Sequence, residues 1–270
     1  MKLLTVPASR GAVWVRSGFR IFFSKPLGFA ALFASFILAA MFLLLVPSIG
    51  PLLVLIVLPL VSQGFMLGTQ QALAGHMPMP EVFTLPLRGP RSRAIDMLKI
   101  GLIYGACSFV IMWISSAADG GRFEILQQAM AEETPDAARI SFLLQDPMLL
   151  GGLLLRLALA SVLSVPFWHA PALIHWDGQG VAQSLFSSTV GCWRNKGAFA
   201  VFGVSWLMVI VVLGVLLNTL FALLLDSPQL VPMAALPAGL MFSTVFYASL
   251  YFTFVDCFGT PEAAPTAPKR

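Results

Sequence analysis

Residues 27–46 read LGFAALFASFILAAMFLLLV, and after only Pro47 and Ser48, residues 49–67 read IGPLLVLIVLPLVSQGFML. Each run is close to the roughly 20 apolar residues that a helix needs to cross the hydrocarbon core of a bilayer. Backbone polar groups find no water in that core, so both runs should be helical. Because so short a connection forces the two helices to be antiparallel neighbours, the stretch predicts a transmembrane hairpin.

Four further apolar runs extend the prediction to six spans. They cover residues 100–117, 148–168, 199–224 and 234–254. Prolines within the spans (Pro59, Pro166 and Pro237) kink a membrane helix without excluding it. We therefore expect an all-α polytopic membrane protein. Residues 1–258 should form one integral membrane domain, and residues 259–270 a disordered cytoplasmic tail.

The composition agrees with this fold class. The chain is 58% apolar and 10% charged, and its mean hydropathy is +0.88, whereas soluble domains average about 25% charged residues. The three cysteines form no CxxC pair, which argues against a disulfide framework. The first apolar run is longer than a signal-peptide core of about 7–15 residues and leads straight into a second run, so it should be retained as a helix.

The basic residues are distributed unevenly between the connections. Two arginines, Arg122 and Arg139, fall on one side of the predicted membrane, and Arg156 falls inside the fourth span. The remaining thirteen of the sixteen lie on the other side: Lys2, Arg10, Arg16, Arg20, Lys25, Arg88, Arg91, Arg93, Lys99, Arg194, Lys196, Lys269 and Arg270. By the positive-inside rule, both termini should be cytoplasmic in a bacterial inner membrane. The basic residues flank spans and form no tract, so nucleic-acid binding is not expected.

Two segments on the basic side are amphipathic at helical spacing. Residues 9–25 and 181–194 each oppose basic and small polar side chains to Trp and Phe, a pattern typical of helices at the headgroup boundary. Each leads directly into a hairpin, and the proline-rich residues 81–93 lead into the hairpin of spans three and four in a comparable position, which suggests a unit of surface segment plus hairpin that is used three times. The expected interfacial residues are Trp14, Arg16, Arg20, Lys25, Trp193 and Arg194.

The densest polar and aromatic stretch is FWHAPALIHW, residues 167–176, followed by Asp177. Its candidate functional residues are His169, His175, Trp176 and Asp177. On a regular helix the two histidine rings point about 120° apart, so only a break at Pro171 brings them together. An aromatic belt with interfacial hydrogen bonds is the first interpretation. Proton or ion handling and metal binding are the alternatives.

Three polar residues inside spans are further candidates. Arg156 must snorkel or pair if it lies within the membrane, with Asp119, Asp146 and Asp226 as candidate partners. Binding of an anion or substrate is the alternative for Arg156. Gln63 and Asn218 are typical of helix-to-helix hydrogen bonding, and they line a pathway if there is one.

FWHAPALIHW, together with CWRN at residues 192–195, resembles a family of uncharacterised six-span bacterial inner-membrane proteins. The likeness continues in ADGGRF at residues 118–123 and YFTF at residues 251–254. Asp177 and Gln183 stand where that family often has basic residues, which weakens a metal or phosphate model centred there. The resemblance implies the architecture and the inner-membrane location, and it implies no activity.

The sequence contains no GxSxG, HExxH, GxxxxGK[ST] or GxGxxG motif. We therefore expect a non-enzymatic accessory or organising protein without a cofactor. Its expected partners are membrane lipids, and a partner protein or a second copy of the chain is a further possibility. The alternative function is a small-solute or lipid transporter with Arg156 lining the pathway, and the third is a membrane-embedded enzyme.

Overall fold

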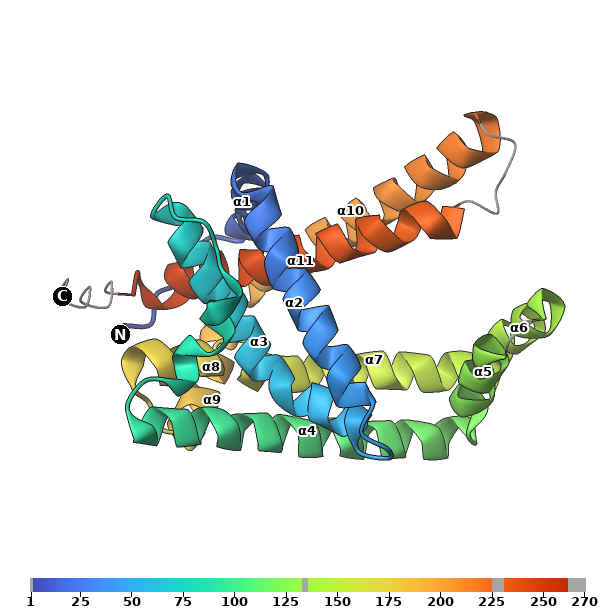
Figure 1. Ribbon diagram of the computed structural model, residues 1–270, viewed down its shortest axis with the longest axis horizontal. Helices are drawn as coiled ribbons and strands as arrows, with labels where there is room; N and C mark the ends of the chain where they lie inside the picture. The colour runs from blue at the N-terminus through green and yellow to red at the C-terminus, as the bar shows by residue number, and fades with distance from the viewer. Residues whose placement is uncertain (1, 133–135, 225–230, 262–270) are drawn as a thin grey trace.

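The computed structural model describes residues 2–132, 136–224 and 231–261, and these ranges contain helices and no strand (Figure 1). The helices in chain order are α1 (Arg10–Ser24), α2 (Pro26–Leu44), α3 (Gly50–Leu73), η1 (Pro80–Phe83), η2 (Leu85–Leu87), α4 (Arg91–Asp119), α5 (Arg122–Ala131), α6 (Ala137–Leu144), α7 (Pro147–Phe167), α8 (Ala170–Ala172), η3 (Leu173–Asp177), α9 (Val181–Arg194), α10 (Lys196–Leu224) and α11 (Val231–Phe258).

Six of these helices are long and apolar enough to cross a membrane, which confirms the predicted fold class. They are α2, α3, α4, α7 continued through Asp177, α10 and α11. Two of the helices are longer than the apolar stretches that predicted them: α4 begins at Arg91, nine residues before the predicted span, and α3 continues to Leu73. The ends of a helix are set by its capping residues and need not coincide with the ends of the apolar stretch. The predicted tail falls largely outside the described residues, as do Asp226 and most of its connection.

Local signals in the sequence explain where several helices begin and end. Asp146 accepts a hydrogen bond from the Met148 N–H at 2.8 Å and caps α7, whose first residue is proline. Gly120 and Gly121 adopt positive φ angles of 61° and 77°, which ends α4 and lets α5 begin at once. These turns place α5 and α6 together, away from the chain termini (Figure 1).

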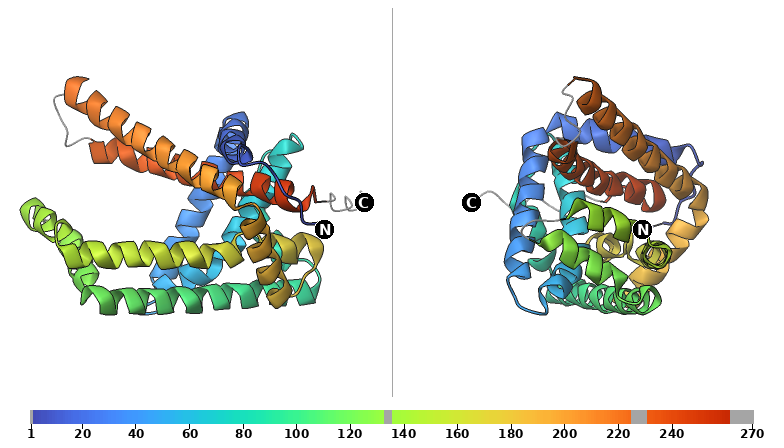
Figure 2. Two further views of the ribbon diagram at one scale, coloured as in Figure 1. Left: turned by 180° about the vertical axis from the view of Figure 1, so that it is seen from behind. Right: turned by 90° about the vertical axis from the view of Figure 1, so that its right-hand side faces the viewer.

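The six long helices form three hairpins: α2–α3, α4–α7 and α10–α11 (Figures 1 and 2). We call the end of the molecule that holds α8, α9 and the last turns of α11 the base. The α4–α7 and α10–α11 hairpins extend from the base in the same direction and separate from each other, while α2–α3 crosses them (Figure 1). Helix α3 contacts both α4 and α11, so this hairpin joins the other two.

Buried side chains concentrate toward the base. In α10, Ala198, Phe202 and Trp206 are buried, whereas the large side chains from Leu207 to Leu216 are mostly exposed. In α2, the buried residues lie in the first two turns, and in α11 they lie from Thr244 onward. The hairpins are therefore packed together near the base and present apolar side chains to their surroundings farther out.

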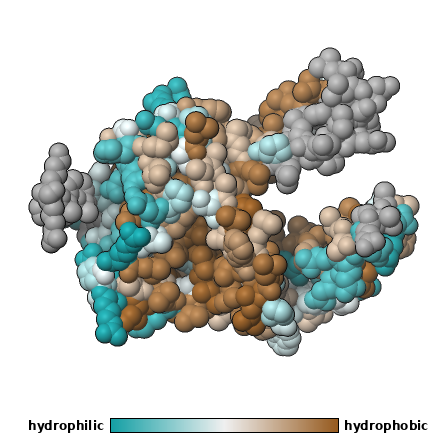
Figure 3. All heavy atoms as spheres, in the orientation of Figure 1, coloured by the Kyte–Doolittle hydropathy of each residue, from teal (hydrophilic) through white to brown (hydrophobic). Residues whose placement is uncertain are grey.

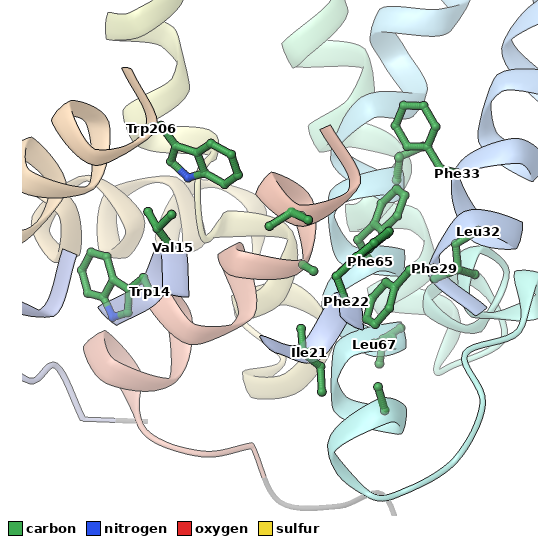
Figure 4. Close-up of a cluster of buried hydrophobic side chains, with 14 of the residues drawn as sticks. Trp14, Val15, Ile21, Phe22, Phe29, Leu32, Phe33, Phe65, Leu67 and Trp206 are labelled. Atoms are coloured by element: carbon green, nitrogen blue, oxygen red, sulfur yellow. The ribbon is translucent and has the colours of Figure 1, made fainter. Parts of the chain in front are cut away.

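The largest core cluster joins α1, α2, α3, α10 and α11 (Figure 4). It is rich in aromatic rings, and Phe65 of α3 stacks on Tyr247 of α11 with ring centroids 5.1 Å apart. Phe22 of α1 meets Phe29 of α2 at 6.2 Å. Aromatic pairs of this kind contribute about 0.5–1.5 kcal/mol beyond the area they bury.

The surface follows the same division (Figure 3). Hydrophilic residues cover the base and the α5–α6 region, and hydrophobic residues cover the part between them. Between the α10–α11 and α4–α7 hairpins the space-filling view is open. A broad apolar middle between two polar ends is the pattern that a membrane protein requires.

Helix α1 is placed differently from the prediction of an interfacial helix. Its apolar face packs on α10 and α11, and Trp14 is fully buried between them and does not face lipid. A side chain at Gly11 would collide with the carbonyl oxygen of Ala198, and a Cβ at Gly18 would lie 2.9 Å from the carbonyl oxygen of Val245. Glycine at these positions lets the backbones meet.

The expected arrangement, in which a surface segment precedes each hairpin, holds in part. Helices α1 and α9 precede the α2–α3 and α10–α11 hairpins, as expected. The segment before α4 forms two short 3₁₀ helices, η1 and η2, because its prolines leave too few backbone donors for an α-helix. The amphipathic helix therefore occurs before two of the three hairpins.

Replacing Gly11 by alanine should lower the thermal unfolding midpoint in detergent, because the new methyl group would force α1 away from α10. Overpacking of this kind costs about 1–3 kcal/mol. Gly214→Ala on α10 is the matched control, since a Cβ there meets nothing within 4 Å. Both substitutions gain the same helix propensity, so equal midpoints for the two variants would contradict the close packing of α1.

Candidate functional site

Polar side chains at the base form three neighbouring groups, two joined by contacts among side chains and one centred on Asn195. We call them together the base cluster, which consists of Arg10, Trp14, His169, Ser188, Cys192, Asn195, Thr253 and Asp256. The base cluster lies where five parts of the chain meet: the N-terminal segment (residues 2–9), α1, the α7–α8 junction, α9 and the end of α11. Its members come from distant parts of the chain, so its geometry depends on how the hairpins pack.

The stretch FWHAPALIHW breaks the fourth span into three pieces. Helix α7 ends at Phe167, α8 covers Ala170–Ala172, and η3 is a single π-helical turn. The break points His169 into the core, where it is fully buried. The backbone N–H of His169 donates to the Ser188 hydroxyl at 3.0 Å, and the ring Nε2 of His169 lies 3.1 Å from the Thr253 hydroxyl. This histidine joins α7, α9 and α11.

Cys192 is the other neighbour of the His169 ring. Its Sγ lies 3.9 Å from His169 Nδ1, and burial raises the pKa of the Cys192 thiol to about 12. Because the thiol stays protonated at neutral pH, it is a poor nucleophile and a poor metal ligand. No group of three His, Cys, Asp or Glu side chains in the described ranges is placed to hold a metal ion.

The remaining candidates of the stretch face elsewhere. The His175 ring contacts Trp176, and the His175 carbonyl oxygen accepts a hydrogen bond from Arg93 at 3.2 Å. Trp176 packs on Tyr251 and Phe254 in the core. Asp177 accepts a hydrogen bond from Gln179 at 2.8 Å. The His175 ring and the His169 ring share none of these contacts.

Asn195, the last residue of CWRN, ties the N-terminal segment to the base. Its Oδ1 accepts the Val6 N–H at 2.8 Å, and its Nδ2 donates to the carbonyl oxygen of Leu4 at 3.0 Å. Nδ2 also donates to the carbonyl oxygen of Gly191 at 3.0 Å. Asn195 is buried, and all of its amide groups are engaged. The sequence shows this residue only as part of a motif.

Asp256, near the end of α11, receives three hydrogen bonds from α1. Arg10 donates Nε at 2.6 Å and Nη2 at 2.9 Å, and Trp14 donates its indole N–H at 2.6 Å. Donating to the Asp256 carboxylate raises the pKa of Arg10 above its ordinary value. Sequence reasoning finds no partner for Asp256. The available signal is that Arg10 and Trp14 stand four residues apart and so share one helix face.

Arg156 lies at the far end from the base. Its Nη2 is 4.0 Å from Asp119 Oδ2, and its guanidinium stands over the Phe123 ring, 4.0 Å from the centroid. Asp119 is fully buried, and its Oδ1 accepts the Gly121 N–H at 2.9 Å. Asp146 instead pairs with Arg122 at 2.6 Å, and this hydrogen bond lowers the pKa of Asp146.

The other polar candidates in the spans are placed as follows. Gln63 is fully buried, and neither amide atom has a hydrogen-bond partner in the described part of the molecule. Asn218 falls in α10, and its side chain lies outside the described residues. Gln63 sits between Leu60 and Met66, which belong to separate core clusters.

Most of the predicted interfacial residues do lie at the protein surface. Arg16, Arg20, Arg194 and Trp193 are exposed, and Lys25 is half-buried. In α9, the polar residues Ser184 and Ser188 face the protein, while the aromatic residues Phe186 and Trp193 are 71% and 70% exposed. The outward face of α9 therefore combines these two aromatic rings with exposed Gln183 and Arg194, a mixture suited to the headgroup boundary.

Two large apolar grooves lie between neighbouring hairpins, and a third lies along the α10–α11 hairpin itself. The α2–α11 groove, about 500 Å³, lies between Ala30–Met41 of α2 and Pro237–Thr244 of α11. The α7–α10 groove, about 450 Å³, lies between Ser161–Trp168 of α7 and Lys196–Trp206 of α10. Lys196 is the one ionisable residue other than Cys192 that lines either groove in the described structure. Neither groove is lined by Gln63 or Arg156.

Comparison with known proteins identifies a relative over the full length. The chain is 34% identical over 275 residues to a probable inner membrane protein of Burkholderia thailandensis, and the match covers 100% of this chain and 97% of the relative. No family model and no solved structure matches the chain.

We expect Asp256→Asn to loosen α1, because the substitution keeps the shape of the side chain and removes its charge. Hydrogen bonds to charged groups contribute about 1.5–3 kcal/mol. The Arg10 side chain is 41% exposed, so solvent screening reduces the loss to about 1–2 kcal/mol. The measurement is the rate of trypsin cleavage after Arg16 and Arg20, which should rise.

The matched control for this experiment is Asp96→Asn. Asp96 pairs with Lys99 at 3.4 Å, and the Lys99 side chain is 60% exposed. Removing that surface pair should leave the cleavage rate unchanged. A cleavage rate of Asp256→Asn no faster than that of the control would show that the contact with Asp256 does not hold α1.

Proposed function

The chain belongs to the same family as the probable inner membrane protein of Burkholderia thailandensis, and we propose that it is a non-enzymatic accessory or organising protein of the inner membrane. In this proposal the protein holds lipid acyl chains in the lateral grooves between its hairpins. The observation that carries the proposal is the pair of apolar grooves between the hairpins. Most buried polar side chains of the described structure are hydrogen-bonded within the chain itself.

The lining of the grooves supports lipid over a polar solute. The α2–α11 groove is lined by Phe, Leu, Ile, Met, Ala and Pro side chains, with Thr244 as its one polar residue in the described structure. The Thr244 hydroxyl already donates to the carbonyl oxygen of Leu240 at 2.8 Å. A polar solute would therefore lose its hydrogen bonds to water and gain none in return. An acyl chain makes no hydrogen bonds, so it loses none when it enters the groove.

The distribution of charge supports an orientation with the base in the cytoplasm. The described basic residues outside Arg122, Arg139 and Arg156 belong to the base and its connections. The opposite end carries the carboxylates of α5, α6 and their connections, including Glu124 and Glu132. A cytoplasmic excess of Lys and Arg sets the orientation of inner-membrane proteins.

A transporter is the second candidate, and the Arg156–Asp119 pair is the observation that favours it. Near the end opposite the base, Asp119 is fully buried and the Arg156 side chain is 20% exposed. Their separation of 4.0 Å exceeds a hydrogen bond, and Asp119 Oδ2 and Arg156 Nε have no hydrogen-bond partner in the described ranges. Such a pair offers a guanidinium that could bind an anion. Against this candidate, neither groove extends to Arg156.

Lipid binding predicts that phospholipid stays with the purified full chain after exchange into detergent. Ala34→Trp fills the α2–α11 groove and should lower the amount of retained phospholipid, measured by solvent extraction and phosphate analysis. Ala31→Trp is the matched control, because Ala31 is exposed on the same helix and lies outside the groove. The proposal fails if the wild-type chain retains no phospholipid, or if both variants retain as much as it does.

A structural role of Arg156 predicts that Arg156→Gln alone is destabilising. It leaves the Asp119 carboxylate buried without its cation, which costs about 3–5 kcal/mol. The double variant Arg156→Gln with Asp119→Asn should recover most of the lost thermal midpoint. An anion-binding role predicts a different result. Inorganic phosphate would then raise the midpoint of the wild-type protein and have no effect on the double variant.

A further inference from the structure

We propose that the α7–α10 groove is a binding site for an anionic phospholipid. One acyl chain lies along the apolar part of the groove, and the phosphate lies against Lys196 and Arg194. The inference rests on the proposed function and adds to it the lipid class and the residues that select it.

The length of the groove fits one leaflet of a membrane. Its wall on α10 runs from Lys196 to Trp206, and ten residues at about 1.5 Å each span roughly 15 Å. The hydrocarbon core of a bilayer is about 30 Å thick, so the groove covers half of it. Its volume of about 450 Å³ lies within the range of about 300–1,000 Å³ that is typical of ligand sites.

The deeper part of the groove is lined mainly by apolar and small side chains, with Trp206 at its end. Phe199, Phe202 and Phe246 form one wall, and Gly203 leaves room between the helices because a Cβ there meets nothing within 4 Å. The serines that line it, Ser161 and Ser164, donate their hydroxyl groups to carbonyl oxygens of their own helix at 2.7 Å. This part therefore suits a hydrocarbon chain.

The charge sits at the mouth of the groove. Lys196 is the first residue of α10, so it lies where that helix enters the apolar region, and its Nζ is 5.1 Å from the centroid of the Trp193 ring. Neither Lys196 nor Arg194 has a carboxylate partner in the described part of the chain. The backbone N–H groups at the start of α10 add positive potential at the same place.

This combination selects a phospholipid over the other possible occupants. Free phosphate would use the cations and leave the apolar groove without a ligand, and a zwitterionic lipid would place its own cation beside Lys196. An anionic headgroup satisfies the cations while its acyl chain fills the groove. Exposed Trp193 has the amphipathic ring that favours the headgroup level. Each basic residue near anionic lipid strengthens binding about fivefold.

The test uses native mass spectrometry on the purified full chain, titrated with phosphatidylglycerol or with phosphatidylcholine. The wild-type protein should bind phosphatidylglycerol more tightly. Lys196→Gln should weaken phosphatidylglycerol binding about fivefold, and Lys196→Gln with Arg194→Gln about 25-fold. Both variants should leave phosphatidylcholine binding unchanged. The inference is wrong if the double variant keeps the wild-type preference for phosphatidylglycerol.

Two further variants test the location of the site. Gly203→Leu fills the groove and should reduce the binding of both lipids. Gly214→Leu, on the same helix with equally open surroundings and outside the groove, should reduce neither. Equal lipid binding by the two variants would contradict this location. Wild-type binding without preference between the two lipids would refute the anionic site and leave the proposed function standing. The absence of any bound lipid would refute both.

Discussion

The hydrogen bonds from Asp256 and Asn195 hold α1 and the N-terminal segment against the α10–α11 hairpin, and the packing at the base builds on this contact. Lipid tails are as apolar as leucine, so helices in a membrane gain little from burying apolar surface against each other, and packing and directed polar contacts must position them. Asp256 supplies three such contacts to α1, and Asn195 supplies two to the N-terminal segment. Farther from the base, few polar contacts join the α4–α7 hairpin to the α10–α11 hairpin. The two hairpins diverge there, and apolar grooves remain between neighbouring hairpins.

The sequence predicts the parts of this structure that depend on length and apolarity. Each span is recognisable because a membrane helix must be both long enough and free of unpaired charge. The same requirement singles out Arg156, since an arginine in a span needs a partner, and Asp119 is one of three carboxylates near the same end of the chain. The structure places Arg156 closest to Asp119, and Asp146 is engaged by Arg122.

The rest depends on which surface meets which, and periodicity does not contain that information. An amphipathic helix with a basic face has the same pattern whether lipid or protein covers its apolar face. Helix α1 packs on α10 and α11, so Trp14 is in the core. His169 and Asp256 acquire their partners Thr253 and Arg10 across 84 and 246 residues of sequence. No local spacing indicates such pairs.

The α7–α10 groove adjoins the base cluster at Trp168, so the proposed lipid site is connected to the packing of the base. Trp168 lines the groove, and its indole N–H donates to the Thr253 hydroxyl at 3.1 Å. The same hydroxyl is 3.1 Å from His169 Nε2, and the His169 backbone is bonded to Ser188 of α9. A ligand that binds only the folded chain stabilises it in proportion to its occupancy. A lipid bound against Trp168, as we propose, would therefore stabilise the junction where α7, α9 and α11 meet, and this role would need neither a catalytic group nor a polar pathway.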